Sequence, residues 1–140
     1  GSVKKYIFAA NNPLSNSVWD LNRPMILVNY WKAIVELLVD ENAAVPSVIY
    51  KTTGVDLFHI VSATVFTRLA ARNDFKKDTI KALLQSGFAN LPDENIAMSH
   101  PEWWQRGGVA SGLNSAAVRK LANALSHSLN VQENAGSVSL

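Results

Sequence analysis

The sequence contains no cysteine among its 140 residues. This absence excludes disulfide bonds, thiolate metal sites and cysteine nucleophiles. It is consistent with a reducing cytoplasm, where we expect the protein to be located. Long hydrophobic runs are also missing, because the most apolar stretch, MILVNYWKAIVELLV, is interrupted by Asn29, Lys32 and Glu36. A membrane-spanning helix needs about 20 apolar residues, so we do not expect the chain to associate with a membrane.

An excess of charge of one sign is missing as well. The chain has 13 Lys and Arg residues against 11 Asp and Glu residues, which gives a formal net charge of +2. So small an excess produces little long-range field, and the composition therefore permits nucleic-acid binding without requiring it. With 48% hydrophobic and 17% charged residues, the chain has the composition of a folded protein. Its length is that of one ordinary domain.

The hydrophobic residues that are present recur at helical spacing in four segments. We predict helices over about residues 24–40, 53–72, 74–87 and 115–129, and a short helical turn at HPEWW. In the first helix, the stripe predicted to face the core consists of Met25, Val28, Trp31, Val35 and Leu38, widened by Leu27 and Ile34. The pattern predicts an all-α, compact single-domain bundle of four to six helices.

Two segments leave room for a minor short strand pair. Residues 3–8 are β-prone and predict a strand or an extended arm, and SVIYKTT fits either a strand or a helical turn. The dipeptide Gly1-Ser2 resembles a cloning remnant, which is expected if the chain is a piece of a longer protein. We expect one helical domain over residues 3–129 and a small, polar, flexible tail over residues 130–140.

The stretch YKTTGVDLFHIV raises the choice between a phosphate-binding loop and a helix start. A Walker-type loop needs several glycines before its lysine, whereas Lys51 precedes a single glycine. Thr53 and Asp56 instead have the spacing of a capping box, in which each side chain bonds the backbone of the other. We therefore predict a capped helix start here, and further caps at Asn22 and Asn114.

A second glycine-bearing segment, RGGVASGLNSAAVRK, precedes the last predicted helix. A flexible backbone at a helix N-terminus favours an anion. The candidate residues for such an anion or nucleic-acid site are Arg106, Gly107, Gly108, Arg119 and Lys120. The alternative is a plain interhelical loop that uses glycine for positive φ angles.

Five basic residues form a strip that could contact phosphates: Arg68, Arg72, Lys76, Lys77 and Lys81. Contacts of this kind bind duplex DNA without reading its sequence. The strip is diluted by Asp74 and Asp78, and the alternative is an ordinary solvated surface.

Trp103 and Trp104 are candidates for binding a protein partner. Neighbouring positions on a helical turn point about 100° apart, so the two rings seldom enter the same core. An exposed tryptophan is typical of binding hot spots. The alternative is that both rings join the loop to the helical body.

No pattern indicates catalysis. The three histidines, His59, His100 and His127, are far apart and lie outside any metal-binding motif. We expect His59 to be packed in a helix and His127 to lie near a helix C-terminus, where positive charge is favourable. No G-x-S-x-G motif is present. We therefore expect no catalytic residues, no metal and no cofactor.

Three stretches together resemble the C-terminal helical part of the DGQHR-motif proteins, the DndB-like group. They are NYWKAIVELL, YKTTGVDLFHIVSATVF and WWQRGGVASGLNSAAVRKLANAL. The resemblance covers about residues 29–125, but the string Asp-Gly-Gln-His-Arg itself is absent. It implies a role in bacterial DNA modification or phage defence. The matching positions, Lys51, Thr52, Thr53, Gly54, Gly107, Gly108 and Gly112, carry no catalytic role with them.

Three functions follow from these observations. The first is a non-catalytic module of a prokaryotic DNA-modification or phage-defence regulator, which contributes DNA contact or assembly. The second is a protein-interaction or homo-oligomerisation domain that does not bind nucleic acid. The third, a fragment of an enzyme that binds nucleotide phosphates, depends on the glycine segment alone.

Overall fold

The computed structural model describes the backbone of residues 1–138 and the side chains of residues 1–131. Its four long helices are α1 (Arg23–Leu38), α2 (Thr52–Arg72), α3 (Lys77–Ala89) and α4 (Ser115–Val138). Six short helical segments accompany them: η1 (Val3–Ile7), η2 (Pro13–Ser15), η3 (Ser17–Trp19), η4 (Asp93–Ser99), η5 (Pro101–Trp104) and η6 (Val109–Gly112). Residues 1–138 contain no strand, so the all-α prediction is confirmed.

The strand pair left open by the sequence is reduced to one isolated antiparallel bridge between Ser47 and Gln105. Residues 3–8 form no strand either, because η1 is a helical turn that buries Ile7. This turn packs on α2, whereas β-branched and aromatic composition alone had favoured an extended chain.

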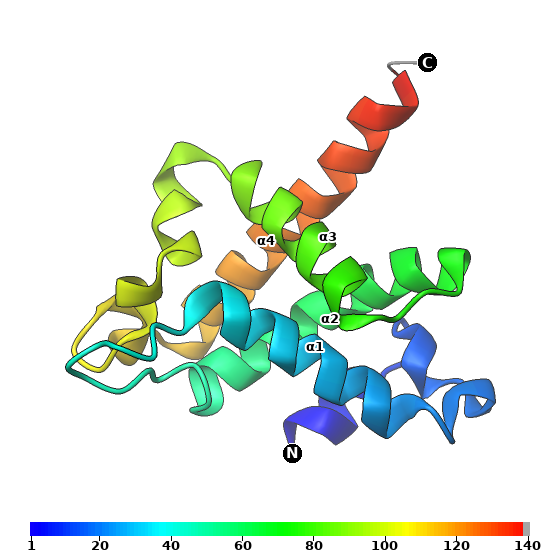
Figure 1. Cartoon of the computed structure of the whole chain (residues 1–140), viewed down its shortest axis with the longest axis horizontal. Helices are drawn as coiled ribbons and strands as arrows, with labels where there is room; N and C mark the ends of the chain where they lie inside the picture. The colour runs from blue at the N-terminus through cyan, green and yellow to red at the C-terminus, as the bar shows by residue number, and fades with distance from the viewer. Residues whose placement is uncertain (139–140) are drawn as a thin grey trace.

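Helix α2 is the centre of the bundle. It packs against α4 and η1, while α3 lies between α1 and α4 (Figure 1). Four large rings fill the core without solvent exposure, namely Tyr30, Phe58, Phe66 and Trp104. The Tyr30 hydroxyl donates a hydrogen bond to the Phe58 carbonyl at 2.5 Å, and burial raises the pKa of this phenol well above its ordinary range. Because the phenol stays protonated, it ties α1 to α2.

The start of α2 differs from the predicted capping box. Lys51 occupies the N-cap position and no side chain caps the helix, so the Thr53–Asp56 arrangement is not formed. The glycine of KTTG has another role: a Cβ at Gly54 would lie 2.7 Å from the carbonyl carbon of Ile49 and 2.8 Å from its Cα. This stretch is therefore shaped by a close backbone approach that only glycine permits.

The core-facing side of α1 is only partly the predicted one, because Ile34 and Leu38 are buried as predicted but Met25 and Val28 are not. Ile26, Tyr30, Ala33, Ile34 and Leu38 are buried, whereas Met25 is 63% and Val28 45% exposed. The helix is apolar on most sides, so periodicity fixed its length but not the direction of its inner face. The rest of the fold leaves the outer side of α1 uncovered. The Asn22 side chain makes no capping bond.

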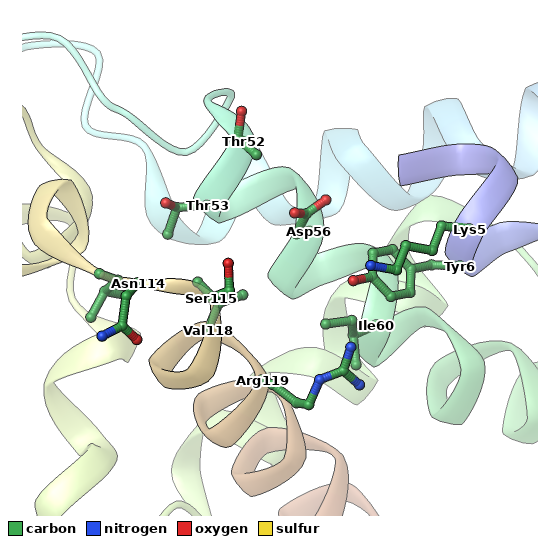
Figure 2. A pocket seen from close by; sticks show the side chains of 11 residues that line it. Lys5, Tyr6, Thr52, Thr53, Asp56, Ile60, Asn114, Ser115, Val118 and Arg119 are labelled. Carbon is green, nitrogen blue, oxygen red and sulfur yellow. The ribbon is translucent and has the colours of Figure 1, made fainter. Parts of the chain in front are cut away.

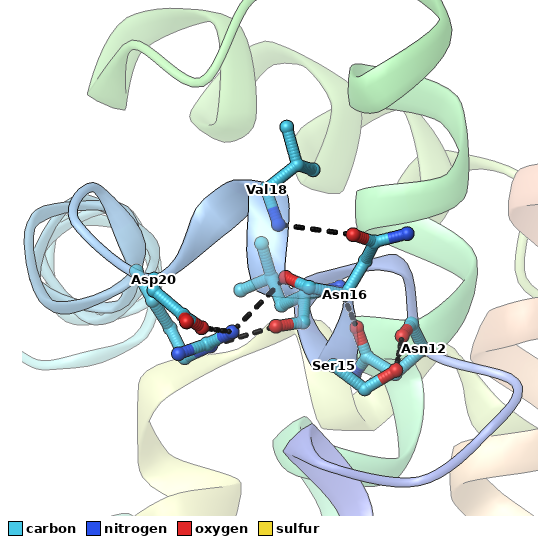
Figure 3. A network of polar contacts seen from close by, with 7 residues as sticks. Asn12, Ser15, Asn16, Val18 and Asp20 are labelled. Atoms are coloured by element: carbon cyan, nitrogen blue, oxygen red, sulfur yellow. Dashed lines mark hydrogen bonds and ion pairs between the residues drawn. The ribbon is translucent and has the colours of Figure 1, made fainter.

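Short-range polar contacts order the loop before α1, as its Asn- and Ser-rich sequence predicts. Asn12 and Asn16 accept hydrogen bonds from the backbone N–H groups of Leu14 and Val18, which start two short turns (Figure 3). The Arg23 guanidinium joins these turns to α1, since it donates to the Leu14 carbonyl and forms an ion pair with Asp20 at 2.8 Å.

The last two helices follow the prediction more closely. Ile80, Leu83 and Leu84 are buried in α3, and Val118, Ala122, Leu125 and Leu129 are buried in α4. Asn114 caps α4 by accepting a hydrogen bond from the Ala117 N–H at 2.8 Å. The helix continues to Val138, nine residues beyond its predicted end at Leu129. His127 therefore lies within α4 and not near its C-terminus, and residues 139–140 of the predicted tail lie outside the described residues.

Helix α2 is long and apolar enough to cross a membrane by length and composition alone. In the fold, 56% of the most apolar part of α2 is buried, and the core helix of a soluble protein can have the same length and composition.

Candidate functional site

The outer side of α1 carries exposed apolar residues that lie together in the fold. A groove of about 660 Å³, which we call the α1 groove, is lined by Val28, Trp31, Lys32, Val35, Glu36, Tyr50 and Lys77. Met25 precedes Val28 by almost one turn on the same side of the helix. Tyr50, from the loop before α2, is 57% exposed and lies with its ring centroid 6.4 Å from that of Trp31. Val28, Trp31 and Val35 of the predicted inner stripe thus line a surface, whereas Leu38 is buried.

Trp31 forms the floor of this groove and is held in place from below. Its ring packs edge-on against Phe58 and His59, with centroids 6.0 and 5.7 Å away. Its indole N–H donates a hydrogen bond to Nε2 of His59 at 3.2 Å. Half-buried and fixed on two sides, Trp31 presents a rigid apolar surface to the groove.

The partner of Trp31, His59, is a packed histidine, as the sequence predicts. It is 5% exposed, and burial lowers its pKa, opposed by a smaller effect of the Asp56 charge. Because Nε2 accepts from Trp31, the proton of the neutral ring is on Nδ1, which lies 2.9 Å from the Ser2 hydroxyl. The ring is therefore a structural link between η1 and α1 and holds no exposed nitrogen for catalysis.

Charged residues border the α1 groove on the side of α3. Glu36 receives ion pairs from Lys77 at 2.7 Å and Lys81 at 3.1 Å. These hydrogen bonds, first that of Lys77 and then that of Lys81, lower the pKa of Glu36. The lining residues Lys32, Lys77 and Glu36 leave a net charge of +1 (two lysines minus one glutamate). Lys81 pairs with Glu36 and Asp78 pairs with Lys77. Their opposite charges cancel, so the net charge of +1 is unchanged.

The predicted basic strip is divided among several partners. Lys77 and Lys81 bind Glu36. The Lys76 side chain is 82% exposed, and its amine lies 3.6 Å from Asp74. Arg68 donates to the side chain of Asn130 on α4 at 3.2 Å, and Arg72 is exposed at the end of α2. Much of the positive charge is therefore balanced within the fold, which favours the solvated-surface interpretation.

The glycine segment before α4 forms a plain loop. Gly107 has a φ of 86°, and its N–H donates to the Ser111 hydroxyl at 3.1 Å. The Gly108 N–H donates to the Gln105 carbonyl at 2.8 Å, and a Cβ there would lie 2.6 Å from the Glu102 carbonyl oxygen. The Arg106 N–H bonds Pro46. These amides are used within the loop, so they do not form the predicted anion site.

A polar pocket of about 400 Å³ lies where η1 meets the starts of α2 and α4 (Figure 2). Among the residues predicted for an anion site, only Arg119 lines it. Sequence reasoning missed Lys5, because more than 100 residues separate it from Arg119 and only the fold brings them to one pocket. The hydroxyls of Thr52, Thr53 and Ser115 add donors, whereas Asp56 opposes an anion. Lys120 is exposed outside this pocket.

The tryptophan pair faces inward. Trp104 has no solvent exposure, donates its indole N–H to the Met98 carbonyl at 2.8 Å, and packs on Phe58. Its predicted role as a partner-binding residue is therefore wrong. Trp103 is half-buried and packs edge-on against Trp104, with centroids 4.8 Å apart. The two rings join the 3₁₀ segment to the helical body, which is the alternative stated above.

Among the side chains of residues 1–131, no group of three or more His, Asp or Glu residues is placed to hold a metal ion. Comparisons with protein-family models, curated proteins and solved structures found no match for this chain. The resemblance to the DGQHR-motif group therefore stays a prediction, and the function is inferred from the surfaces described here.

Proposed function

We propose that the chain is a non-catalytic helical module that works by assembly, and that it binds a protein partner through the α1 groove. One observation carries this proposal: α1 is apolar on two sides, and the fold buries only one of them. Val28, Met25 and Tyr50 are 45%, 63% and 57% exposed beside the half-buried Trp31. Contiguous apolar surface of this kind marks interaction sites, and aromatic residues and methionine are enriched there.

The biological setting that we propose comes from the sequence resemblance. A DndB-like context would make the partner a component of a prokaryotic DNA-modification or phage-defence system. The groove itself supports assembly in general and is compatible with any such partner.

Site-specific photocrosslinking in cells tests the assembly proposal. A benzophenone side chain at position 28 is expected to form discrete adducts, because this position faces the groove. The matched control is position 131 on α4, where Val131 is 44% exposed, almost the same as Val28. Adducts at both positions alike, or at neither, would contradict a binding role for the groove.

Contact with DNA phosphates is a second candidate function. It is favoured by the polar pocket, in which Lys5 and Arg119 stand among three hydroxyls, and by the exposed Arg72 and Lys76. Fluorescence anisotropy with duplex DNA at increasing salt tests this function. If Arg119 contacts a phosphate, Arg119→Gln lowers the salt slope by about 1, whereas Lys32→Gln leaves it unchanged. Binding that is independent of salt would exclude phosphate contact.

The enzyme interpretation depends on the glycine segment, whose amides are bonded within the loop.

A further inference from the structure

We infer that the occupant of the α1 groove is an acidic amphipathic helix of another protein, whose apolar face covers Trp31 and whose carboxylates meet Lys32. This inference rests on the proposed function and adds the chemistry of the partner. Three properties of the groove support it: the spacing of its apolar residues, the balance of its charges and the fixed position of its floor.

The apolar residues of the groove have the spacing that a partner helix needs. Val28, Trp31 and Val35 succeed one another along α1 at i, i+3 and i+7, and Met25 extends the row at its N-terminal end. At 1.5 Å per residue, the row from Met25 to Val35 is about 15 Å long, roughly three turns of a helix. Tyr50 forms the opposite wall. An apolar row with Tyr50 beside it suits the helix-in-groove mode, in which anchors at i, i+3, i+4 and i+7 enter one groove.

The charges at the border select an acidic partner. Glu36 is already bound by Lys77 and Lys81, so it offers little attraction to an incoming cation. Lys32 is exposed, and among the described side chains no carboxylate forms an ion pair with it. An acidic side chain that enters from solvent therefore finds an available lysine, whereas a basic one meets net positive charge.

The same charges disfavour a second copy of this chain. A symmetric pair of α1 grooves would bring Lys32 and the other lysines of one copy against those of its partner. Like charges facing each other across an interface cost binding free energy. The only carboxylate in the lining, Glu36, is engaged within its own chain and would have to leave two lysines to compensate.

The floor of the groove is fixed before a partner arrives. His59 and Phe58 hold the Trp31 ring from below, and the Trp31–His59 hydrogen bond sets its orientation. A side chain already held in its bound orientation loses little conformational entropy on binding. Trp31 is therefore suited to be the central anchor of the contact.

Two designed peptides test the partner chemistry. Both are 18-residue helices with leucines at i, i+3, i+4 and i+7, and they differ only in having glutamate or lysine on the flanking positions. The readout is the two-dimensional NMR spectrum of the whole ¹⁵N-labelled chain, with the Trp31 indole N–H as the local reporter. We expect the acidic peptide to shift this signal and to bind about fivefold or more tighter than the basic one.

Charge reversal at one lysine provides the matched comparison. Lys32→Glu is expected to weaken the acidic peptide about fivefold and to strengthen the basic one. Lys120→Glu, an equal change at an exposed lysine of α4, is expected to change neither. Both variants alter exposed side chains, so their spectra also show that the fold is retained.

The outcomes separate this inference from the proposed function. If both peptides shift Trp31 equally and Val28→Ser weakens both, the groove binds partners but the acidic selection is wrong. If sedimentation shows a dimer that Val28→Ser dissociates, the occupant is a second copy and the inference is overturned while assembly stands. If neither peptide shifts Trp31 and photocrosslinking at position 28 gives no adduct, both the inference and the proposed function fail.

Discussion

Both sides of α1 carry apolar residues, but the fold buries only one side. The inner side, with Tyr30 and Ile34, is sealed in the core, while the outer side, with Met25 and Val28, faces solvent. The inner side makes a directional bond to α2 through the Tyr30 hydroxyl, and the outer side is bordered by lysines. Hydrophobicity therefore does not by itself distinguish a buried face from an exposed one. The following substitutions test this contrast, beginning with the largest expected effect on stability.

Trp104→Ala is expected to cost the most. Its ring is completely buried against Phe58, and its indole N–H bonds the Met98 carbonyl. Truncation of a buried aromatic residue lowers the free energy of unfolding by about 3–5 kcal/mol. Urea denaturation followed by circular dichroism measures this change. A loss below about 1 kcal/mol would mean that the ring is not part of the core.

Gly54→Ala is expected to lower the free energy of unfolding by about 1–3 kcal/mol, because the new methyl group would overlap the backbone of Ile49. Gly112→Ala is the matched control, since a Cβ there has no atom within 4 Å. Thermal denaturation of both variants measures the difference. Equal melting temperatures would show that the KTTG stretch does not approach Ile49 as closely as described.

Tyr30→Phe tests the buried side of α1 by removing a single oxygen atom. It removes the hydroxyl that binds the Phe58 carbonyl and is expected to lower the free energy of unfolding by about 1 kcal/mol. Tyr50→Phe makes the same change on the exposed side and is expected to have almost no effect. A similar loss in both variants would remove the distinction between a bonded core tyrosine and a surface one.

The free energy of unfolding is expected to decrease as the pH is lowered below about 6.5, the ordinary pKa of histidine. Burial lowers the pKa of His59 in the folded chain. As the pH falls, His59 is therefore protonated in the unfolded chain before it is protonated in the folded chain, and this stabilises the unfolded state. The contribution is complete above the unfolded pKa and is lost as pH falls toward the lower folded value. Denaturation curves between pH 7.5 and 5 of the chain and of His59→Gln measure it. An unchanged pH dependence in the variant would assign the loss to other groups.

Val28→Ser should have the smallest effect on stability, within about 0.5 kcal/mol, because its side chain is exposed. The same change is expected to reduce crosslinking or peptide binding at the α1 groove. Val131→Ser on α4 is expected to alter neither property. A large loss of stability from Val28→Ser would place this residue in the core and remove the basis for the binding face.

The sequence predicted the helices but not all of their contacts. Their number and approximate bounds followed from periodicity, and in α3 and α4 the apolar residues at helical spacing are indeed the buried ones. In α1 the polar residues Asn29, Lys32 and Glu36 also recur at helical spacing, beside Met25 and Val28, but the prediction followed the apolar residues and assigned Met25 and Val28 to the core. The polar pocket was missed for another reason: Lys5 and Arg119 meet only through tertiary packing.

The wall of the α1 groove is fixed by a part of the chain more than 50 residues away. Tyr50 stands at the end of a loop whose Val48 N–H bonds the Trp104 carbonyl at 2.6 Å, next to the Ser47–Gln105 bridge. The width of the groove is thus set jointly by the loop before α2 and by the turn that carries the two tryptophans. A chain that ends before residue 104 would keep every lining residue of the groove. It would lose the Trp104 and Gln105 contacts that hold the loop carrying Tyr50. A fragment that preserves the α1 groove therefore has to include both segments.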